Sequence, residues 1–376
     1  MKVLLTATVQ SHICQFHKPL VEVLHAHGCE VHVAARDNLK EKNGLKLDFV
    51  EKVYNVPFAR SPKSVDNITA YRELRKIIAK EKYDVIHCNT PMGGIVTRLA
   101  AKKTRKNGTK VYYTAHGFHF YKGAPKKNWM IFYPIEKYFS KLTDKVITIT
   151  REDYSLARKK FYCDVERIHG VGVDEQRYFE VDNETKNNLK KKMNFGLNQK
   201  IILCVGELNK NKNQMMAIEA MKNIVKKYPD ILFVLAGNGP EKENLEKAIK
   251  ERNLTKNVKM IGYVTNLQEY QHIADIAISC SKREGLPLNI VEAMLSGTPV
   301  VATMNRGHRE LIRDGVTGFI VDINDKEKLE NTIIELLSNQ DKYDMVSRAA
   351  WKNARQYTFK SVKKELEQIY FKNFKR

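Results

Sequence analysis

The chain has 376 residues, more than a single hydrophobic core usually serves, which favours two domains. Hydrophobic residues make up 43% and charged residues 29% of it, so its composition excludes wholesale disorder. Lysine and arginine number 65 against 43 aspartates and glutamates, and the net charge of +22 predicts a polyanionic partner: nucleic acid, an anionic membrane or a phosphate-rich substrate.

The sequence shows no sign of a membrane span or of export. No apolar run approaches the ~18 residues that a spanning helix requires, and the chain begins with a strand-like run rather than a signal peptide. We therefore expect a protein that stays inside the cell. The six cysteines occur without a C-x2-C pair, so we expect reduced thiols rather than a zinc site or a disulfide framework.

Apolar strand-like runs alternate with amphipathic stretches along the first half, which predicts a parallel sheet flanked by helices. The expected strands are residues 3–7, 31–34, 85–88, 111–114 and 146–149. The expected helices include residues 19–27 and 68–80.

A second series of the same kind follows a polar, Lys/Asn-rich stretch at 182–200. Its expected strands are residues 201–205, 231–236, 258–261, 276–279, 299–302 and 319–321, with helices at 214–227, 240–250 and 288–296. We place the domains at residues 1–175 and 176–355, and we expect residues 356–376 to form a basic helix that packs back on the first domain. Two doubly wound domains bind ligands at their strand-to-helix loops.

The loop expected after the first strand, residues 8–12, contains no glycine, so the G-x-G-x-x-G fingerprint of a dinucleotide-binding fold is absent there. The sequence also lacks a Walker-type phosphate loop and a D-x-D pair that would chelate a metal against a diphosphate. These absences argue against a nicotinamide dehydrogenase and against metal-dependent phosphate chemistry. We therefore expect no metal and no cofactor.

Two loops in the second half have the composition of phosphate-binding loops. The first begins with Gly206 and carries Lys210 and Lys212, which would offer backbone N–H groups and a cation to a diphosphate. The second contains Gly237 and Gly239, which allow close backbone approach. On composition alone, a solvated loop and a tight turn remain the simpler explanations.

A third loop carries two glutamates, Glu284 and Glu292, separated by seven residues. The first lies in a Gly/Pro loop and the second inside the helix that follows. Eight helical steps span about 12 Å, on the order of the distance between the sugar and the ribose of a nucleotide sugar. The helix also directs its positive end at the loop, where a phosphate would bind.

The stretch EGLPLNIVEAMLSGTPVVA, with the preceding VGELNKNKN loop and AGNGP turn and the following RELIRDGVTGFIV, resembles the retaining glycosyltransferases of family 4. The resemblance covers the second domain in order and spacing. It implies the GT-B fold, an α/β architecture of two tandem Rossmann-like domains that face each other across a cleft. It also implies that the second domain binds a nucleotide sugar and the first domain binds the acceptor.

The resemblance assigns donor-side roles residue by residue. Glu284 would hold hydroxyls of the donor sugar, Glu292 those of the ribose, and Lys212 the diphosphate. The predicted donor site is completed by Gly206, Gly237, Gly239, Gly285, Leu286, Pro287 and Leu288. Where the family often has an arginine, this chain has Glu207, which would repel phosphate, so we expect Lys210 or another basic residue to compensate.

In the first domain, YTAHGFH resembles the family's strand-end histidine motif. This implies that His116 lies nearest the reacting sugar and acts with Glu284 and Lys212 in catalysis. The glycine pair that the family has in its first loop is missing, and His12 and His17 are nearby instead.

Residues 98–145 carry 12 basic residues, two acidic residues and ten aromatic residues. Lysines and aromatics interleaved along 126–141 are typical of a surface that rests on anionic lipid, although ordinary helix packing is the alternative and Pro134 should interrupt any long interfacial helix. The predicted acceptor and membrane residues are His12, His119, Lys122, Lys126, Lys127 and Trp129.

The stretch from TAHGFHF to KVITI resembles bacterial capsule, exopolysaccharide and glycan-assembly enzymes of the family. It implies a UDP-sugar donor, such as a UDP-N-acetylhexosamine, and an undecaprenyl-diphosphate-linked saccharide acceptor. It also implies a cytoplasmic protein peripherally associated with the bacterial cell membrane. A nucleotide-sugar 2-epimerase of the same fold is the alternative enzyme. A basic nucleic-acid-binding protein is the other alternative, although no recognition motif supports it.

Overall fold

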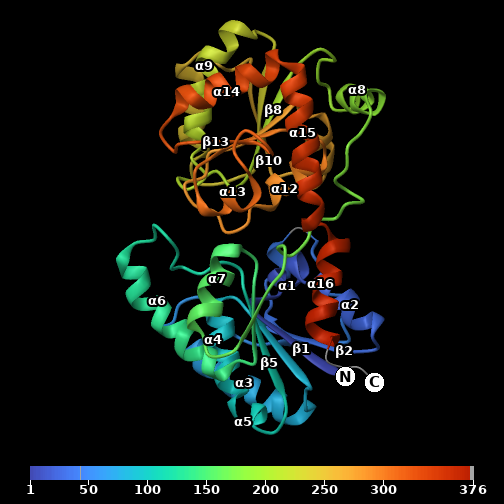
Figure 1. Cartoon of the computed structure of the whole chain (residues 1–376), viewed down its shortest axis with the longest axis vertical. Coiled ribbons are helices and arrows are strands. Elements are labelled where there is room, and N and C mark those ends of the chain that lie inside the picture. The colour runs from blue at the N-terminus through green and yellow to red at the C-terminus, as the bar shows by residue number, and fades with distance from the viewer. Residues whose placement is uncertain (43, 373–376) are drawn as a thin grey trace. The chain divides into compact units, whose positions relative to one another are not determined.

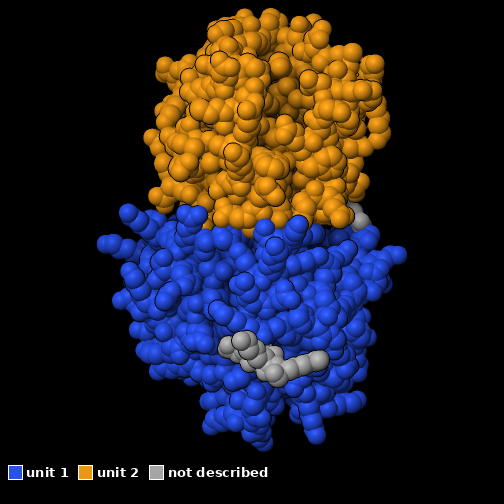
Figure 2. Space-filling model, turned by 45° about the vertical axis from the view of Figure 1, so that its right-hand side comes forward, with its two compact units in different colours: residues 1–172, 359–376 blue, residues 173–358 orange. Residues whose placement is uncertain are grey.

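The computed structural model describes residues 1–42 and 44–372, and the chain divides into two compact units (Figures 1 and 2). Unit 1 comprises residues 1–172 and the C-terminal segment that begins at Phe359, and unit 2 comprises residues 173–358. The division after residue 172 lies close to the boundary predicted near 175, and the return to unit 1 at 359 lies close to the predicted 356.

The sheet of unit 1 has seven parallel strands in the order β3-β2-β1-β4-β5-β6-β7 within the described residues. They are β1 (Lys2–Val9), β2 (Glu30–Arg36), β3 (Lys52–Asn55), β4 (Val85–Asn89), β5 (Lys110–Ala115), β6 (Lys145–Thr148) and β7 (Asp164–Arg167). The hydrophobic pattern missed β3 and β7 because these edge strands are short and largely exposed or polar. An edge strand requires no continuous apolar run.

The helices of unit 1 flank this sheet. They are α1 (Gln10–Phe16), α2 (Lys18–Ala26), α3 (Asp66–Glu81), α4 (Pro91–Ala100), α5 (Lys102–Arg105), α6 (Lys126–Phe139), α7 (Arg151–Lys160) and α16 (Phe359–Phe371), with 3-10 turns η1 (Leu39–Glu41) and η2 (Ser140–Leu142). Figure 1 shows α16 beside the first strands of the chain, and its residues contact α2.

Three sequence predictions for unit 1 were wrong in detail. Residues 8–12 are not a loop, because β1 continues to Val9 and α1 begins at the next residue. Pro134 does not interrupt α6. The carbonyl that loses its hydrogen bond belongs to Met130, and both residues lie on the exposed side of the helix, where water can replace the missing N–H. The C-terminal helix begins at Phe359 rather than 356, and the predicted residues 373–376 lie outside the described chain.

The sheet of unit 2 has six parallel strands in the order β10-β9-β8-β11-β12-β13, again within the described residues. They are β8 (Ile201–Val205), β9 (Leu232–Ala236), β10 (Val258–Gly262), β11 (Ile276–Ser279), β12 (Val300–Thr303) and β13 (Phe319–Val321). These six strands confirm the sequence prediction to within a residue or two. Their side chains are mostly buried because helices cover both faces of the sheet.

The helices of unit 2 begin at polar capping residues in several cases. The carboxylate of Asp182 accepts the N–H of Thr185 at 2.8 Å, and that of Asp325 accepts the N–H of Lys328 at 2.9 Å. The helices are α8 (Asn183–Lys192), α9 (Gln214–Lys227), α10 (Lys242–Glu251), α11 (Leu267–Ile273), α12 (Leu288–Leu295), α13 (Arg306–Leu311), α14 (Lys326–Ser338) and α15 (Gln340–Ala354), followed by η3 (Arg355–Tyr357).

The strand order reverses between β1 and β4 in unit 1 and between β8 and β11 in unit 2. Open parallel sheets bind ligands outside the carboxyl ends of their strands at such a reversal, which directs attention to the loops after these four strands and after β5. Within residues 1–42 and 44–372, none of the helices combines the length and the apolar character that crossing a membrane would require.

Candidate functional site

The loop after β8 is held by backbone hydrogen bonds to the end of β9 and to the loop that follows β9. The N–H of Gly206 donates to the carbonyl of Ala236, and that of Leu208 donates to the carbonyl of Asn238, both at 2.9 Å. A Cβ on Gly206 would lie 3.2 Å from Cε of Lys212, so the glycine leaves room for the lysine stem. Some of the amides predicted to face a diphosphate are thus engaged within the unit, which leaves the lysine as the main anion-binding group of this loop.

Gly237 and Gly239 hold the loop after β9 against the loop after β8. A Cβ on Gly237 would lie 2.0 Å from the carbonyl oxygen of Gly206, and one on Gly239 would lie 2.3 Å from that of Leu208. A side chain at either position would therefore push the two loops apart. The structure gives both glycines a packing role at the predicted site.

Two asparagines fix the lysine-bearing loop. Oδ1 of Asn209 accepts the N–H of Lys212 at 2.9 Å, and its Nδ2 donates to Oε2 of Glu207 at 2.9 Å. Nδ2 of Asn211 donates to the carbonyl of Arg283 at 3.0 Å and ties this loop to the loop after β11. The Glu207 carboxylate is therefore held by an asparagine amide.

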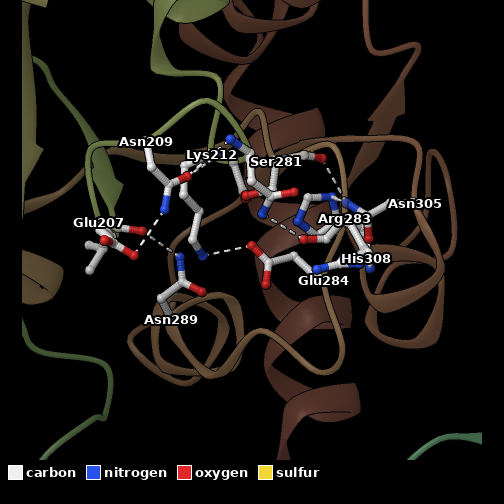
Figure 3. Close-up of polar contacts among 12 residues, drawn as sticks. Glu207, Asn209, Lys212, Ser281, Arg283, Glu284, Asn289, Asn305 and His308 are labelled. Atoms are coloured by element: carbon white, nitrogen blue, oxygen red, sulfur yellow. Dashed lines mark hydrogen bonds and ion pairs between the residues drawn. The ribbon is translucent and has the colours of Figure 1, made fainter. Parts of the chain in front are cut away.

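Lys212 and Glu284 meet at the centre of this arrangement (Figure 3). Nζ of Lys212 lies 2.6 Å from Oε1 of Glu284, and the two side chains are 22% and 13% exposed. Because the pair is partly shielded from water, the attraction between the charges is stronger than at a surface. It places a cation that can bind phosphate next to a carboxylate that can accept hydrogen bonds from sugar hydroxyls.

A buried group behind Glu284 escaped the sequence analysis. Gly307 packs against the glutamate so closely that a Cβ there would lie 2.7 Å from the Glu284 Cβ. His308 is fully buried, with Nδ1 2.5 Å from the carbonyl of Thr303 and Nε2 without a hydrogen-bond partner among the described residues. Burial lowers the pKa of His308 to about 4, so its ring is neutral at pH 7. The sequence could have indicated His308 as a site residue, because it follows closely on the carboxyl end of β12.

Glu292, the second glutamate of the predicted pair, lies in α12. Burial raises the pKa of its carboxyl to about 7, although the positive charge of Arg177 and a hydrogen bond from Tyr178 both favour the ionised form. Arg177 and Tyr178 lie near the start of unit 2 and were not predicted as site residues. Glu292 is thus placed to be partly protonated near neutral pH.

The predicted turn from Gly285 to Leu288 leads directly into α12, with Pro287 in the capping position. Leu286 and Leu288 pack against the hydrophobic core of this side of unit 2. Nδ2 of Asn289 donates to the carbonyl of Val205 at 3.1 Å, which fixes the helix start beside the end of β8. The first N–H groups of a helix lack partners in the helix itself, so this end favours an anion.

Unit 1 brings together three histidines at the carboxyl ends of its strands. Nε2 of His12 lies 3.2 Å from Nε2 of His116, which also lies 3.4 Å from Oδ1 of Asn89. The His17 ring lies beside both, with ring centroids 5.4 Å from His12 and 5.6 Å from His116. Burial lowers the pKa of His12 to about 2 and that of His116 to about 4. Sequence analysis named each of these residues, but it could not place them in contact.

The other predicted acceptor and membrane residues lie around α6. The ring of His119 stacks on Phe132 with centroids 4.6 Å apart, and Nε1 of Trp129 donates to the carbonyl of Tyr121 at 3.1 Å. The backbone N–H of Lys122 donates to a carboxylate oxygen of Glu152 at 2.6 Å. Lys126 and Lys127 form the exposed first turn of α6.

The outer face of α6 is apolar and basic. Met130 is 76% exposed, Ile131 is 42% exposed and Tyr138 is 55% exposed. We call these three residues, with Lys126 and Lys127 and with Lys141 of the following turn η2, the α6 surface. The spacing of the five residues that belong to α6 places them along one side of the helix. The opposite side is anchored in unit 1 by Glu136 and Phe139, which are buried.

Two family descriptions match this chain. Residues 185–353 match the family described as "Glycosyl transferases group 1", and residues 2–150 match the family described as "Glycosyl transferase 4-like". A Bacillus subtilis (strain 168) protein named "Putative glycosyltransferase EpsD" is 38% identical over 371 residues, which cover 98% of this chain and 96% of that protein.

A second relative is more specific in name and more distant in sequence. The Escherichia coli "UDP-Gal:alpha-D-GlcNAc-diphosphoundecaprenol alpha-1,3-galactosyltransferase" is 28% identical over 303 residues, covering 78% of this chain and 77% of that protein. Among solved structures, Anabaena Alr3699/HepE in complex with UDP has a TM-score of 0.79 at 18% identity, covering 98% of this chain and 99% of that one. WaaG, a glycosyltransferase of lipopolysaccharide biosynthesis, has a TM-score of 0.75 at 15% identity with the same coverage.

Proposed function

Because the chain belongs to the glycosyltransferases and its two parallel-sheet units have the GT-B fold, we propose that it is a retaining hexosyltransferase that uses a UDP-sugar. The proposed acceptor is a saccharide linked to undecaprenyl diphosphate, in capsule, exopolysaccharide or glycan assembly. The observation that carries the proposal is the contact between Lys212 and Glu284 at the strand-order reversal of unit 2. The donor chemistry and the acceptor chemistry named by the Escherichia coli relative support it.

In the proposed reaction, unit 2 holds the donor. Lys212 and the positive end of α12 stabilise the negative charge that develops on the departing UDP, so no metal is required there. Glu284 accepts hydrogen bonds from the donor sugar, and Glu292 accepts them from the ribose. A phosphate oxygen of the donor takes the proton of the acceptor hydroxyl, and the new bond forms on the face from which UDP leaves. His116 of unit 1 orients the sugar.

We further propose that the α6 surface rests on the cytoplasmic membrane leaflet. Its exposed apolar residues can enter the head-group layer, and its lysines can approach anionic lipid. Such a position would keep the enzyme close to an acceptor that the membrane retains.

Vesicle sedimentation at low and high salt tests whether the α6 surface binds membranes. Replacing Met130 and Ile131 with serine should weaken binding to anionic vesicles, whereas Met345→Ser, at a 57% exposed site in unit 2, should leave it unchanged.

The transferase assay uses the whole chain, a panel of radiolabelled UDP-sugars and polyprenyl-diphosphate-sugar acceptors, with EDTA present. We expect one donor to label the lipid fraction. The absence of labelling with every donor would contradict the proposal. Conversion of a UDP-sugar without acceptor would indicate the 2-epimerase, and tight binding of nucleic acid at 0.2 M salt would revive the nucleic-acid alternative.

A further inference from the structure

The histidine cluster of unit 1 contains more ring nitrogens than one sugar-orienting histidine requires. His12 comes from α1, His17 from the junction of α1 and α2, and His116 from the end of β5. Each offers one ring nitrogen, and these three atoms lie within 4.8 Å of one another. Residues more than 100 positions apart in the sequence thus converge at one point, although the sequence predicted no metal site.

One spacing in the cluster matches that of a three-histidine metal site. In a tetrahedral zinc site the Zn–N distances of about 2.0–2.1 Å place neighbouring ligand nitrogens about 3.3 Å apart. The Nε2 atoms of His12 and His116 are already 3.2 Å apart. The nitrogen of His17 lies within 4.8 Å of both, so it has to move closer by at most about 1.5 Å to reach that separation.

His17 supplies an independent sign of a ligand-binding site. Its side chain is 4% exposed, and its Nε2 has no hydrogen-bond partner among the described residues. A buried polar atom without a partner costs free energy unless something binds it. The Phe16 ring packs 4.9 Å from the His12 ring, and the His87 ring packs 6.1 Å from the His17 ring. Oδ1 of Asn89 lies 3.4 Å from Nε2 of His116, and burial, together with the nearby positive charge of Arg60, lowers the pKa of His12.

We propose that His12, His17 and His116 bind one divalent transition metal of the zinc class, and that this metal inhibits the transferase. Three imidazoles without a carboxylate suit zinc and disfavour magnesium and calcium, which prefer oxygen ligands. Both His12 and His116 are partly exposed, so a fourth position stays open to water or an anion. The inhibitory effect rests on the proposed function, because a metal on His116 would prevent that ring from orienting the donor sugar.

The first test measures binding without any substrate, so that it stands even if the proposed reaction is wrong. The chelator-treated full chain is titrated with Zn²⁺ against a colorimetric chelator. We expect one zinc ion per chain. His17→Gln and His12→Gln should each weaken binding roughly tenfold or more, as expected for the loss of a ligand. His25→Gln, at an exposed histidine outside the cluster, is the matched control.

The proposal would be overturned if the unaltered chain bound no more zinc than a double His12→Gln/His17→Gln variant does. So would equal affinity of His17→Gln and the unaltered chain, provided that both have the same thermal unfolding midpoint. If His17→Gln is poorly folded, His12→Gln alone decides, because His12 is partly exposed and tolerates replacement better.

The second test measures inhibition. Micromolar zinc should reduce transfer by the unaltered chain, and EDTA should restore it. The transfer that His17→Gln supports without zinc should not change when micromolar zinc is added. Zinc binding with unchanged transfer would leave the metal site in place and refute the inhibitory role. Absence of transfer in every sample would instead count against the proposed function.

Discussion

At the scale of single residues, the central feature is the ion pair between Lys212 and Glu284. The pair is partly buried, so each charge compensates the desolvation of the other. In the proposed reaction the donor separates them, with the diphosphate binding the lysine and the sugar hydroxyls binding the glutamate. Removing one partner therefore has two effects, since it deletes a ligand contact and leaves the other charge without its neighbour.

We expect Lys212→Ala to reduce kcat/KM roughly 100-fold, in the range seen when one group that stabilises developing negative charge is removed. Glu284→Ala should cause a similar loss through the donor sugar. Lys222→Ala, on the exposed side of α9, is the matched control for a general loss of positive charge. Steady-state kinetics with the active UDP-sugar measure all three. An equal loss in Lys222→Ala would show that Lys212 has no special role.

Because the pKa of Glu292 is raised, we expect that removing its charge increases stability at high pH but weakens the binding of UDP. A carboxyl with a pKa of about 7 in the folded chain and a normal value near 4.5 when unfolded holds its proton more tightly when folded. Its contribution to stability is therefore largest at low pH and is lost as the pH rises from about 4.5 through 7. The loss can reach ~3 kcal/mol.

We therefore expect Glu292→Gln to raise the thermal unfolding midpoint at pH 8.5 and to leave it nearly unchanged at pH 4.5. The same variant should bind UDP more weakly at pH 8.5, because it lacks the charge that strengthens hydrogen bonds from ribose hydroxyls. Thermal unfolding and UDP titration at both pH values measure these effects. Glu243→Gln, on the surface of α10, should change neither quantity.

At the scale of elements, α6 is held in place by a buried ion pair. Arg98 of α4 is fully buried, and both its terminal nitrogens lie 3.1 Å from Oε2 of Glu136 in α6. Its guanidinium also lies over the rings of Tyr113 and Phe139, at 4.2 and 4.9 Å. The inner side of α6 is thus fixed by charge and by aromatic packing, and its outer side, the α6 surface, is exposed.

We expect Glu136→Ala to destabilise the chain by about 3–5 kcal/mol, because it leaves the Arg98 charge buried and unpaired. The double change Arg98→Met/Glu136→Leu should cost much less, since it removes both charges. Urea unfolding followed by circular dichroism gives both values. Glu22→Ala breaks a surface pair with Lys363 and should cost less than about 1 kcal/mol. If Glu136→Ala lowered the free energy of unfolding no more than the double change does, the ion pair would not be what holds α6 in place.

At the scale of the whole molecule, the chain leaves unit 1 after residue 172 and its last helix returns to it. The hydroxyl of Tyr370 lies 2.5 Å from Nδ1 of the buried His87, whose Nε2 lies 2.6 Å from Oγ1 of Thr114. Oε1 of Glu365 lies 2.5 Å from Nδ1 of His169. Helix α16 therefore completes the core of unit 1 from the far end of the sequence.

We expect Tyr370→Phe to lower stability by about 1–3 kcal/mol, because a buried ring nitrogen of His87 loses its partner. Removing residues 359–376 should have a larger effect, since it also exposes the apolar surface of unit 1 that α16 covers. Limited proteolysis should then cut within residues 1–172. Tyr138→Phe, at an exposed tyrosine, should be neutral. Equal stability of the shortened chain would show that α16 is dispensable.

Much of the fold could be predicted from the sequence because it is encoded locally. The strands of unit 2 are continuous apolar runs, and α9 spans the predicted residues 214–227. Strand β7 was not predicted because a strand at the edge of the sheet needs no continuous apolar pattern. The predicted break of α6 at Pro134 was wrong because the exposed side of the helix tolerates the proline. The lysine and glutamate of the donor site were found from their motifs, whereas Gly307 and His308 were not.

By itself, the sequence determined the two βα units, the family and the residue types of the donor loops, since these depend on periodicity and on short motifs. Only the tertiary structure decided which residues touch. It gave Gly237 a packing role, joined His12 and His17 to His116, and paired Arg98 of α4 with Glu136 of α6. Such contacts link segments far apart in the chain, and no local pattern records a distance between residues that folding alone brings together.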